Sequence, residues 1–183
     1  MDALAQLIAA AQAAGEGSAR ALPPVHLWNP ASCGEIDIVI RPDGLWFHEG
    51  TPIGRPQLVQ LFSTVLRRDD DGFWLVTPVE KLKITVEDAP FTAVRVDRAG
   101  EALAFQTNVG DRVEAGAGHP IRVEMDAVTG EPRPYLHVRA GLEALIVRPV
   151  FYELVAMGEP RGSRLGIASN GEWFDLGPLG AAQ

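Results

Sequence analysis

The chain has 183 residues, of which 46% are hydrophobic, and its formal net charge is −8 at pH 7. This length and composition suffice to bury a core and fit one domain or two small ones, which excludes a disordered chain. The acidic balance argues against a nucleic-acid-binding protein, because neutralising a phosphate backbone needs clustered Lys and Arg. A single cysteine excludes an internal disulfide framework and a cysteine-rich zinc site, and it fits a cytoplasmic protein.

Residues 1–31 predict a helix followed by a linker. Leu4, Leu7 and Ile8 recur at helical spacing in an Ala-rich stretch, which is typical of a short amphipathic helix. The stretch carries an acidic residue in place of a basic leader and is interrupted by glutamines, so we expect neither a signal peptide nor a membrane span. Docking on the rest of the chain is the expectation for this helix, and docking on a partner chain is the alternative.

Strands dominate the remaining sequence, with two helices among them. Alternating apolar and polar residues, as in 35–41, predict half-buried strands, and the Asp-Gly pair at 43–44 predicts a hairpin turn. Strands are expected at 35–41, 45–48, 73–77, 82–87, 94–96, 102–105, 121–125, 135–138, 142–147, 165–168 and 172–174, and helices at 56–68 and 149–157. The predicted fold class is therefore α+β.

Two parts of the sequence resemble each other. The first part has a turn after Arg41 and an Arg-Pro pair at 55–56. The second part has the same two features, a turn after Arg139 and an Arg-Pro pair at 148–149. This echo predicts an internal duplication that gives two similar sheet-plus-helix halves, with a ligand cleft between them. The predicted domains are residues 1–31 (helix and linker), 32–130 (first half) and 131–183 (second, shorter half).

Arg55 and Arg148 are the first candidate binding residues. Both lie at the start of an expected helix, where free backbone N–H groups and the helix dipole favour an anion. A guanidinium beside such a helix start can hold a phosphate or carboxylate with two hydrogen bonds. The alternative for each arginine alone is a bond to a neighbouring acid or carbonyl, and the repetition of the pair favours the binding hypothesis.

Other titratable residues follow predicted strands. Glu80 and Lys81 either contribute to a site or form a solvated ion pair, and His48 and His137 either bind a ligand or pack beside aromatic side chains. The sequence has no His-Glu-x-x-His motif, no complete EF-hand loop, no glycine-rich phosphate loop and no Gly-x-Ser-x-Gly elbow. These absences argue against a metal site, phosphoryl transfer and serine hydrolysis.

Seven runs together resemble the bacterial domain-of-unknown-function family DUF1285. They are residues 26–30, 33–38, 43–53, 75–81, 86–91, 107–111 and 135–145, and they extend the resemblance over nearly the whole chain. The resemblance implies duplicated α+β halves, of which the C-terminal one is loosely pleckstrin-homology-like. It also implies a ligand site at the junction of the halves for a nucleotide-like molecule, and a signalling role.

The expected function is therefore a non-enzymatic protein that binds a small anionic or nucleotide-like ligand between the halves, without a cofactor. The predicted ligand-binding residues are His48, Arg55, Glu80, Lys81, Asp88, Asn108, Tyr135, His137, Arg139, Arg148 and Tyr152. Two alternatives stay open: a protein-interaction module without a small ligand, and a hydrolase that uses a histidine with Glu80 or Asp88 as acid and base.

Overall fold

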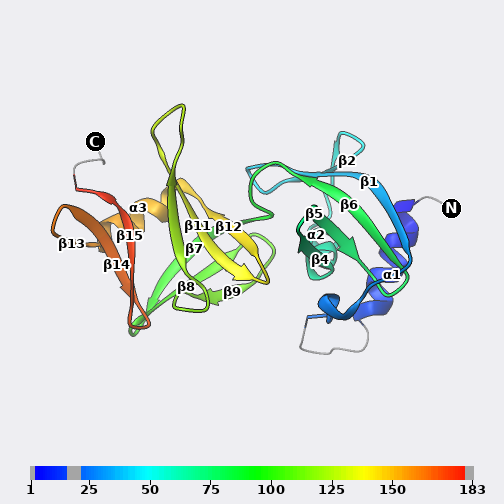
Figure 1. Cartoon of the computed structure of the whole chain (residues 1–183), viewed down its shortest axis with the longest axis horizontal. Helices are drawn as coiled ribbons and strands as arrows, with labels where there is room; N and C mark the ends of the chain where they lie inside the picture. Colours follow the sequence, from blue (N-terminus) through cyan, green and yellow to red (C-terminus); the bar gives the residue numbers. More distant parts are fainter. Residues whose placement is uncertain (1–2, 16–21, 180–183) are drawn as a thin grey trace. The chain divides into compact units, whose positions relative to one another are not determined.

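The computed structural model describes residues 3–15 and 22–179, and the chain forms two compact units, residues 1–88 and 89–183 (Figure 1). Part of the predicted linker, residues 16–21, lies outside the described residues. Each unit is built on its own six-stranded sheet, and each is described by itself below.

Unit 1 contains a sheet with the strand order β3-β2-β1-β6-β5-β4. Its strands are β1 (Ser32–Ile40), β2 (Trp46–His48), β3 (Thr51–Pro52), β4 (Leu66–Asp69), β5 (Gly72–Val76) and β6 (Glu80–Val86). β1 pairs in parallel with β6, and the other neighbours are antiparallel. As the alternation predicts, Ile36, Ile38 and Ile40 of β1 are buried while Asp37 is exposed.

Helix α2 (Pro56–Thr64) ends before the predicted position at Arg68. The hydroxyls of Ser63 and Thr64 each donate a 2.7 Å hydrogen bond to the carbonyl three residues earlier, which competes with continuation of the helix. Residues 66–69 then form β4, which pairs with β5. The apolar residues up to Leu66 predicted a longer helix because they recur at helical spacing. Leu66 is buried as a strand residue of β4, so its apolar character fits both structures.

Helix α1 (Ala3–Gly15) packs against α2 and fully buries Leu7 and Ala11. After it, the short 3-10 helix η1 (Val25–Leu27) lies against β4. Arg67 of β4 holds this segment: its Nη1 donates to the carbonyl oxygens of Val25 (3.0 Å) and Trp28 (2.7 Å). The Nε and Nη2 groups of the same guanidinium bind both oxygens of Asp69 at 2.8 and 2.9 Å.

Asp69 is the shared acceptor of this network, because Lys81 Nζ also lies 2.5 Å from its Oδ2. The hydrogen bond from Arg67, followed by that from Lys81, holds the pKa of Asp69 below its ordinary value of 3.8. The stabilisation by the charged form is therefore present above about pH 4 and is lost as the pH falls through the folded-state pKa.

Replacing Asp69 by Asn (D69N) should lower the free energy of unfolding at pH 7 by about 1–2 kcal/mol, because the charged hydrogen bonds from Arg67 and Lys81 weaken. The difference from wild type should shrink at pH 3, because the unfolded wild-type chain binds a proton at Asp69 below pH 3.8 while the lowered pKa opposes this in the folded state. Urea unfolding at both pH values measures this. The neighbouring exposed Asp70 provides the control, and equal effects of D69N and D70N at pH 7 would contradict the role assigned to Asp69.

Unit 2 contains a second sheet with the order β10-β11-β12-β7-β8-β9. Its strands are β7 (Phe91–Ala99), β8 (Ala102–Thr107), β9 (Arg112–Glu114), β10 (Ile121–Met125), β11 (Pro132–Arg139) and β12 (Leu142–Ile146). β12 pairs in parallel with β7, and the other neighbours are antiparallel. The predicted boundary between residues 130 and 131 falls inside this unit, because β10 and β11 pair with each other along their length.

Helix α3 (Arg148–Met157) follows β12 and buries Val150, Phe151 and Leu154 while packing against β7 and β14. The chain ends in a three-stranded sheet of β13 (Glu159–Arg161), β14 (Arg164–Ser169) and β15 (Glu172–Pro178). The helix predicted at 149–157 and the strands predicted at 165–168 and 172–174 are all present.

The two units share a pattern. Each six-stranded sheet consists of two antiparallel three-stranded parts that a single parallel pair joins, β1 with β6 and β12 with β7. Each unit also has a hairpin, β1-β2 or β11-β12, and then a helix with proline at its start. The predicted α+β fold of two similar sheet-plus-helix halves is confirmed, and the pleckstrin-homology likeness of the second half stays a prediction.

Gly166 in β14 allows the final sheet to pack closely. A Cβ atom at this position would lie 2.1 Å from Trp173 Cζ2 and 2.6 Å from the carbonyl oxygen of Phe174, so the backbone itself blocks a side chain. Replacing Gly166 by Ala should lower the free energy of unfolding by about 1–3 kcal/mol, as overpacking does. Thermal unfolding checks this, with Gly118→Ala as the control because nothing lies within 4 Å of a Cβ there. Equal stability of the two variants would contradict the close packing.

Candidate functional site

The structure distributes the predicted site residues over both units. His48, Arg55, Glu80, Lys81 and Asp88 belong to unit 1, and Asn108, Tyr135, His137, Arg139, Arg148 and Tyr152 belong to unit 2. Because the expected cleft lies between the halves, a site that unites all of these residues stays a prediction. The contacts of each group are given below within its own unit.

In unit 1, Lys81 is engaged with Asp69 and with the face of Trp74, whose centroid lies 3.9 Å from Nζ. Its ion-pair partner is therefore a residue from another strand and not the adjacent Glu80, which begins β6 half-buried. Arg55 is exposed and directly precedes α2, as predicted. His48 is half-buried at the end of β2.

In unit 2, three predicted residues make contacts that stabilise the sheet. Arg139 forms a 2.6 Å ion pair with Asp111 and lies 4.9 Å from the ring centre of Phe91. Asn108 Oδ1 accepts a hydrogen bond from the backbone N–H of Thr92, and the buried Tyr135 has its hydroxyl 3.0 Å from Arg133 Nε. These contacts fix the ends of strands and hold a buried aromatic side chain.

His137 has both ring nitrogens bound to backbone groups. Its Nε2 accepts the N–H of Gly141 at 3.1 Å, so Nδ1 carries the proton and donates to the carbonyl oxygen of Gly118 at 3.1 Å. The ring also stacks on His119, with 5.9 Å between ring centroids. With both nitrogens occupied, His137 is poorly placed to act as the acid or base of a hydrolase.

Arg148 and Tyr152 lie on α3. Arg148 is the first residue of the helix, and its Nη2 lies 2.5 Å from Glu131 Oε2 with both side chains largely exposed. This ion pair matches the alternative that the sequence left open for each arginine alone. Tyr152 is 58% exposed on the helix surface.

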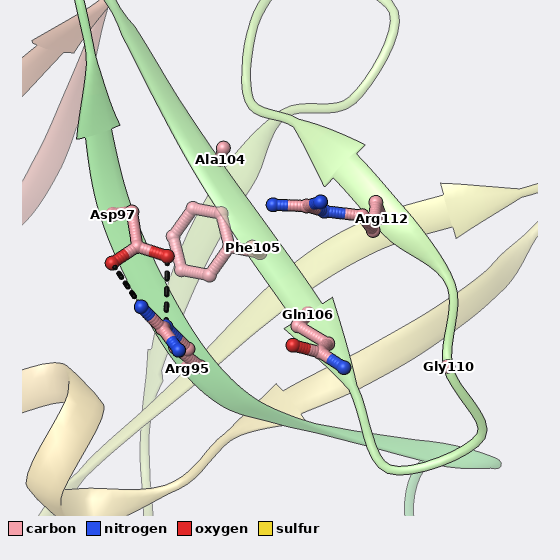
Figure 2. Close-up of a pocket in the computed structure, with 7 residues that line it drawn as sticks. All are labelled: Arg95, Asp97, Ala104, Phe105, Gln106, Gly110 and Arg112. Atoms are coloured by element: carbon pink, nitrogen blue, oxygen red, sulfur yellow. Dashed lines mark hydrogen bonds and ion pairs between the residues drawn. The ribbon is translucent and has the colours of Figure 1, made fainter.

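A hollow of about 250 Å³ lies on the three-stranded part of the second sheet formed by β7, β8 and β9 (Figure 2). Its lining comes from these strands and from the turn before β9. The residues are Arg95, Asp97, Ala104, Phe105, Gln106, Gly110 and Arg112, and we call this site the β7–β9 hollow.

Strand register places three polar side chains of this hollow in one row. Arg95 of β7 lies opposite Gln106 of β8, which lies opposite Arg112 of β9. Directly opposite residues in antiparallel strands point to the same face, so the three side chains share it. In the next row, Asp97 lies opposite Ala104, whose small side chain leaves open space between the strands on either side.

The two arginines of the hollow differ in their partners. Arg95 donates from Nε and Nη2 to the two oxygens of Asp97 at 2.8 and 3.0 Å, and this hydrogen bonding lowers the pKa of Asp97. The guanidinium of Arg112 makes no hydrogen bond or ion pair with any residue in the described part of the chain. It extends from β9 across β8, on the same side as the Arg95–Asp97 pair (Figure 2).

A second hollow of about 350 Å³ offers a comparison. It lies between β10 and the strands β14 and β15, and it is also lined by two arginines. Arg122 is bound by Glu143 at 2.6–2.7 Å and also by Glu124, and Arg164 is bound by Asp175 at 2.6–2.8 Å. Its cations are therefore already neutralised, whereas Arg112 of the β7–β9 hollow forms no ion pair with a residue in 3–15 or 22–179.

Sequence reasoning missed Arg95, Gln106 and Arg112. Strands within β7 and β8 were predicted, at 94–96 and 102–105, but the three-residue strand β9 was not, so Arg112 had no place in a sheet. The available signal was the spacing of two residues between Arg95 and Asp97 and between Ala104 and Gln106. In a strand, this spacing places the side chains of each pair on the same face.

Within residues 3–15 and 22–179, no group of three or more His, Cys, Asp or Glu side chains is arranged to hold a metal ion. In the same part of the chain, no helix has the length and apolar character needed to span a membrane.

The fold and the hollow define a two-unit α+β protein whose second sheet carries an arginine that no other described residue binds. Two family models match the chain: the N-terminal domain of DUF1285, a domain of unknown function, over residues 23–89, and the C-terminal domain of the same family over residues 90–176. The chain belongs to the DUF1285 family, which confirms the resemblance seen in the sequence. The junction of the two models coincides with the boundary between the compact units to within one residue.

Two solved structures are similar to this chain. A DUF1285 family protein from Silicibacter pomeroyi DSS-3 is 51% identical with a TM-score of 0.86, and the match covers 94% of this chain and 95% of that one. A DUF1285 family protein from Shewanella baltica OS155 is 28% identical with a TM-score of 0.53, over 65% of this chain and 90% of that one. No curated protein matches the chain.

Proposed function

We propose that this chain is a non-enzymatic protein that binds a small anionic ligand in the β7–β9 hollow of unit 2. The observation that supports this most is the guanidinium of Arg112, which lines a hollow of about 250 Å³ and makes no hydrogen bond or ion pair with any of the described residues. The proposal keeps the ligand class expected from the sequence and assigns it to a different set of side chains.

The chemistry of arginine favours this role for Arg112. Its guanidinium stays charged at physiological pH and presents a planar set of donors that matches a carboxylate or phosphate. Because Arg112 lies on a strand paired with β8, its backbone is held in place before a ligand arrives. A binding group on a rigid element loses less conformational freedom on binding than one on a loop.

The helix-start arginines are weaker candidates within their own units. Arg148 already has Glu131 as a partner at 2.5 Å, so an added anion would have to compete with it. Arg55 is exposed at the start of α2 and keeps its predicted role as a candidate. The nucleotide-like ligand, the cleft shared by both halves and the signalling role stay predictions.

The protein-interaction alternative has one observation in its favour. Val128 is 95% exposed at the tip of the hairpin that joins β10 and β11, which projects from its sheet (Figure 1). Asp126 orders this tip by accepting hydrogen bonds from the backbone N–H groups of Val128 and Thr129. A single apolar side chain is a small contact surface, so we place this function second.

A thermal-shift assay with a panel of small anions tests the proposed function. A ligand at one hundred times its dissociation constant should stabilise the wild-type protein by about 2.7 kcal/mol, which raises Tm by roughly 5–10 °C for a chain of this size. Arg112→Ala should remove most of this shift because the charged donors are lost.

Arg55→Ala and Arg148→Ala are the matched variants, since each removes one of the helix-start guanidinium groups. We expect both to retain the shift. The proposal fails if no anion raises Tm above the value in sodium chloride of equal ionic strength, or if Arg112→Ala responds as wild type does.

A further inference from the structure

We infer that the ligand of the β7–β9 hollow is a small monocarboxylate that carries a hydroxyl or amino hydrogen-bond donor next to its carboxylate, in preference to a phosphate. This inference rests on the proposed function and specifies the chemical class of its ligand. It follows from the charge balance of the hollow, from the acceptors it leaves available and from its size.

The side chains that line the hollow carry a net charge of +1. Arg95 and Asp97 form an ion pair, and Arg112 adds the remaining positive charge. Glu114 lies two residues along β9 from Arg112 and opposite Ala104, so Asp97 and Glu114 place two carboxylates in the cross-strand row next to that of Arg112. A carboxylate brings a single negative charge, whereas a phosphate monoester brings about −1.5 to −2 at pH 7 and meets repulsion from both acids.

The side chains around Arg112 supply complementary positions for a second polar group. Each carboxylate oxygen of Asp97 accepts one hydrogen bond from Arg95, and an ionised carboxylate has lone pairs for further donors. A ligand hydroxyl or ammonium can therefore donate to Asp97 while the ligand carboxylate binds Arg112. The amide of Gln106, in the row between Arg95 and Arg112, can accept or donate as the ligand requires.

The floor and size of the hollow limit the ligand. Ala104 contributes apolar surface and separates Asp97 from the β9 side of the sheet. A volume of about 250 Å³ corresponds to roughly eight water molecules at their share of liquid volume. A compact acid of a few carbon atoms fits this space together with part of its hydration.

Isothermal titration calorimetry of the full chain tests the inference with five probes: propionate, lactate, alanine, inorganic phosphate and ethyl phosphate. Lactate and alanine each add one donor group to the propionate skeleton, and we expect them to bind about tenfold more tightly than propionate because that donor meets the charged Asp97. Both phosphates should bind more weakly than lactate.

Asp97→Asn removes the negative charge of this side chain while keeping its size and shape. It removes the negative charge beside Arg95, so it should decrease the preference for lactate over propionate and increase the affinity for inorganic phosphate. Asp175→Asn is the matched control, because Asp175 forms an equivalent ion pair with Arg164 in the other hollow at similar exposure. The control should bind all five probes as wild type does, and Tm values with circular dichroism confirm that both variants are folded.

The outcomes distinguish the inference from the function beneath it. If phosphates bind more tightly than lactate and Arg112→Ala abolishes that binding, the carboxylate inference is overturned while the proposed function stands. If lactate and alanine bind no better than propionate, the role of Asp97 as an acceptor is overturned. If none of the probes and no other anion binds, both proposals are overturned together.

Discussion

The parallel strand pair at the centre of each sheet is the constraint on which both units depend. Parallel neighbours cannot be joined by a tight hairpin, so the chain between them must build the other strands on the way. In unit 2, Phe91, Thr92 and Ala93 of β7 pair with Ala144, Leu145 and Ile146 of β12, and five of these six side chains are buried. This buried seam fixes the start of β7, and the continuation of the same strand carries Arg95 and Asp97 into the β7–β9 hollow.

Local patterns predicted the elements whose stability is local. Three local patterns each predicted one element, and all three elements are present. They are the alternation around Ile38, the hairpin turn at 43–44 and the proline at the start of α3. The echo between the Arg-Pro segments revealed the repeated architecture for the same reason, because similar short-range patterns build similar hairpin and helix pairs. The end of α2 was predicted too late, since pairing of β4 with β5 decides where that helix stops.

The candidate site was harder to predict because the partners of charged residues are distant in sequence. Lys81 meets Asp69 from two strands away, Arg139 meets Asp111 from the segment between β8 and β9, and His137 is occupied by two backbone groups. The residue types alone could not show that these groups are satisfied. The same limitation hid Arg112, which makes no hydrogen bond or ion pair within the described part of the chain, a property that becomes visible only when the whole strand order is known.

The edge of the first sheet carries a further consequence. β4 is the last strand in its sheet, and one side of an outermost strand has backbone groups that a strand of another molecule could pair with. Arg67 draws η1 against this strand through two carbonyl groups, and Arg68 places a second cation on it. Charge and a neighbouring segment on an outermost strand disfavour edge-to-edge association, so we expect the network that stabilises the fold also to oppose aggregation through β4.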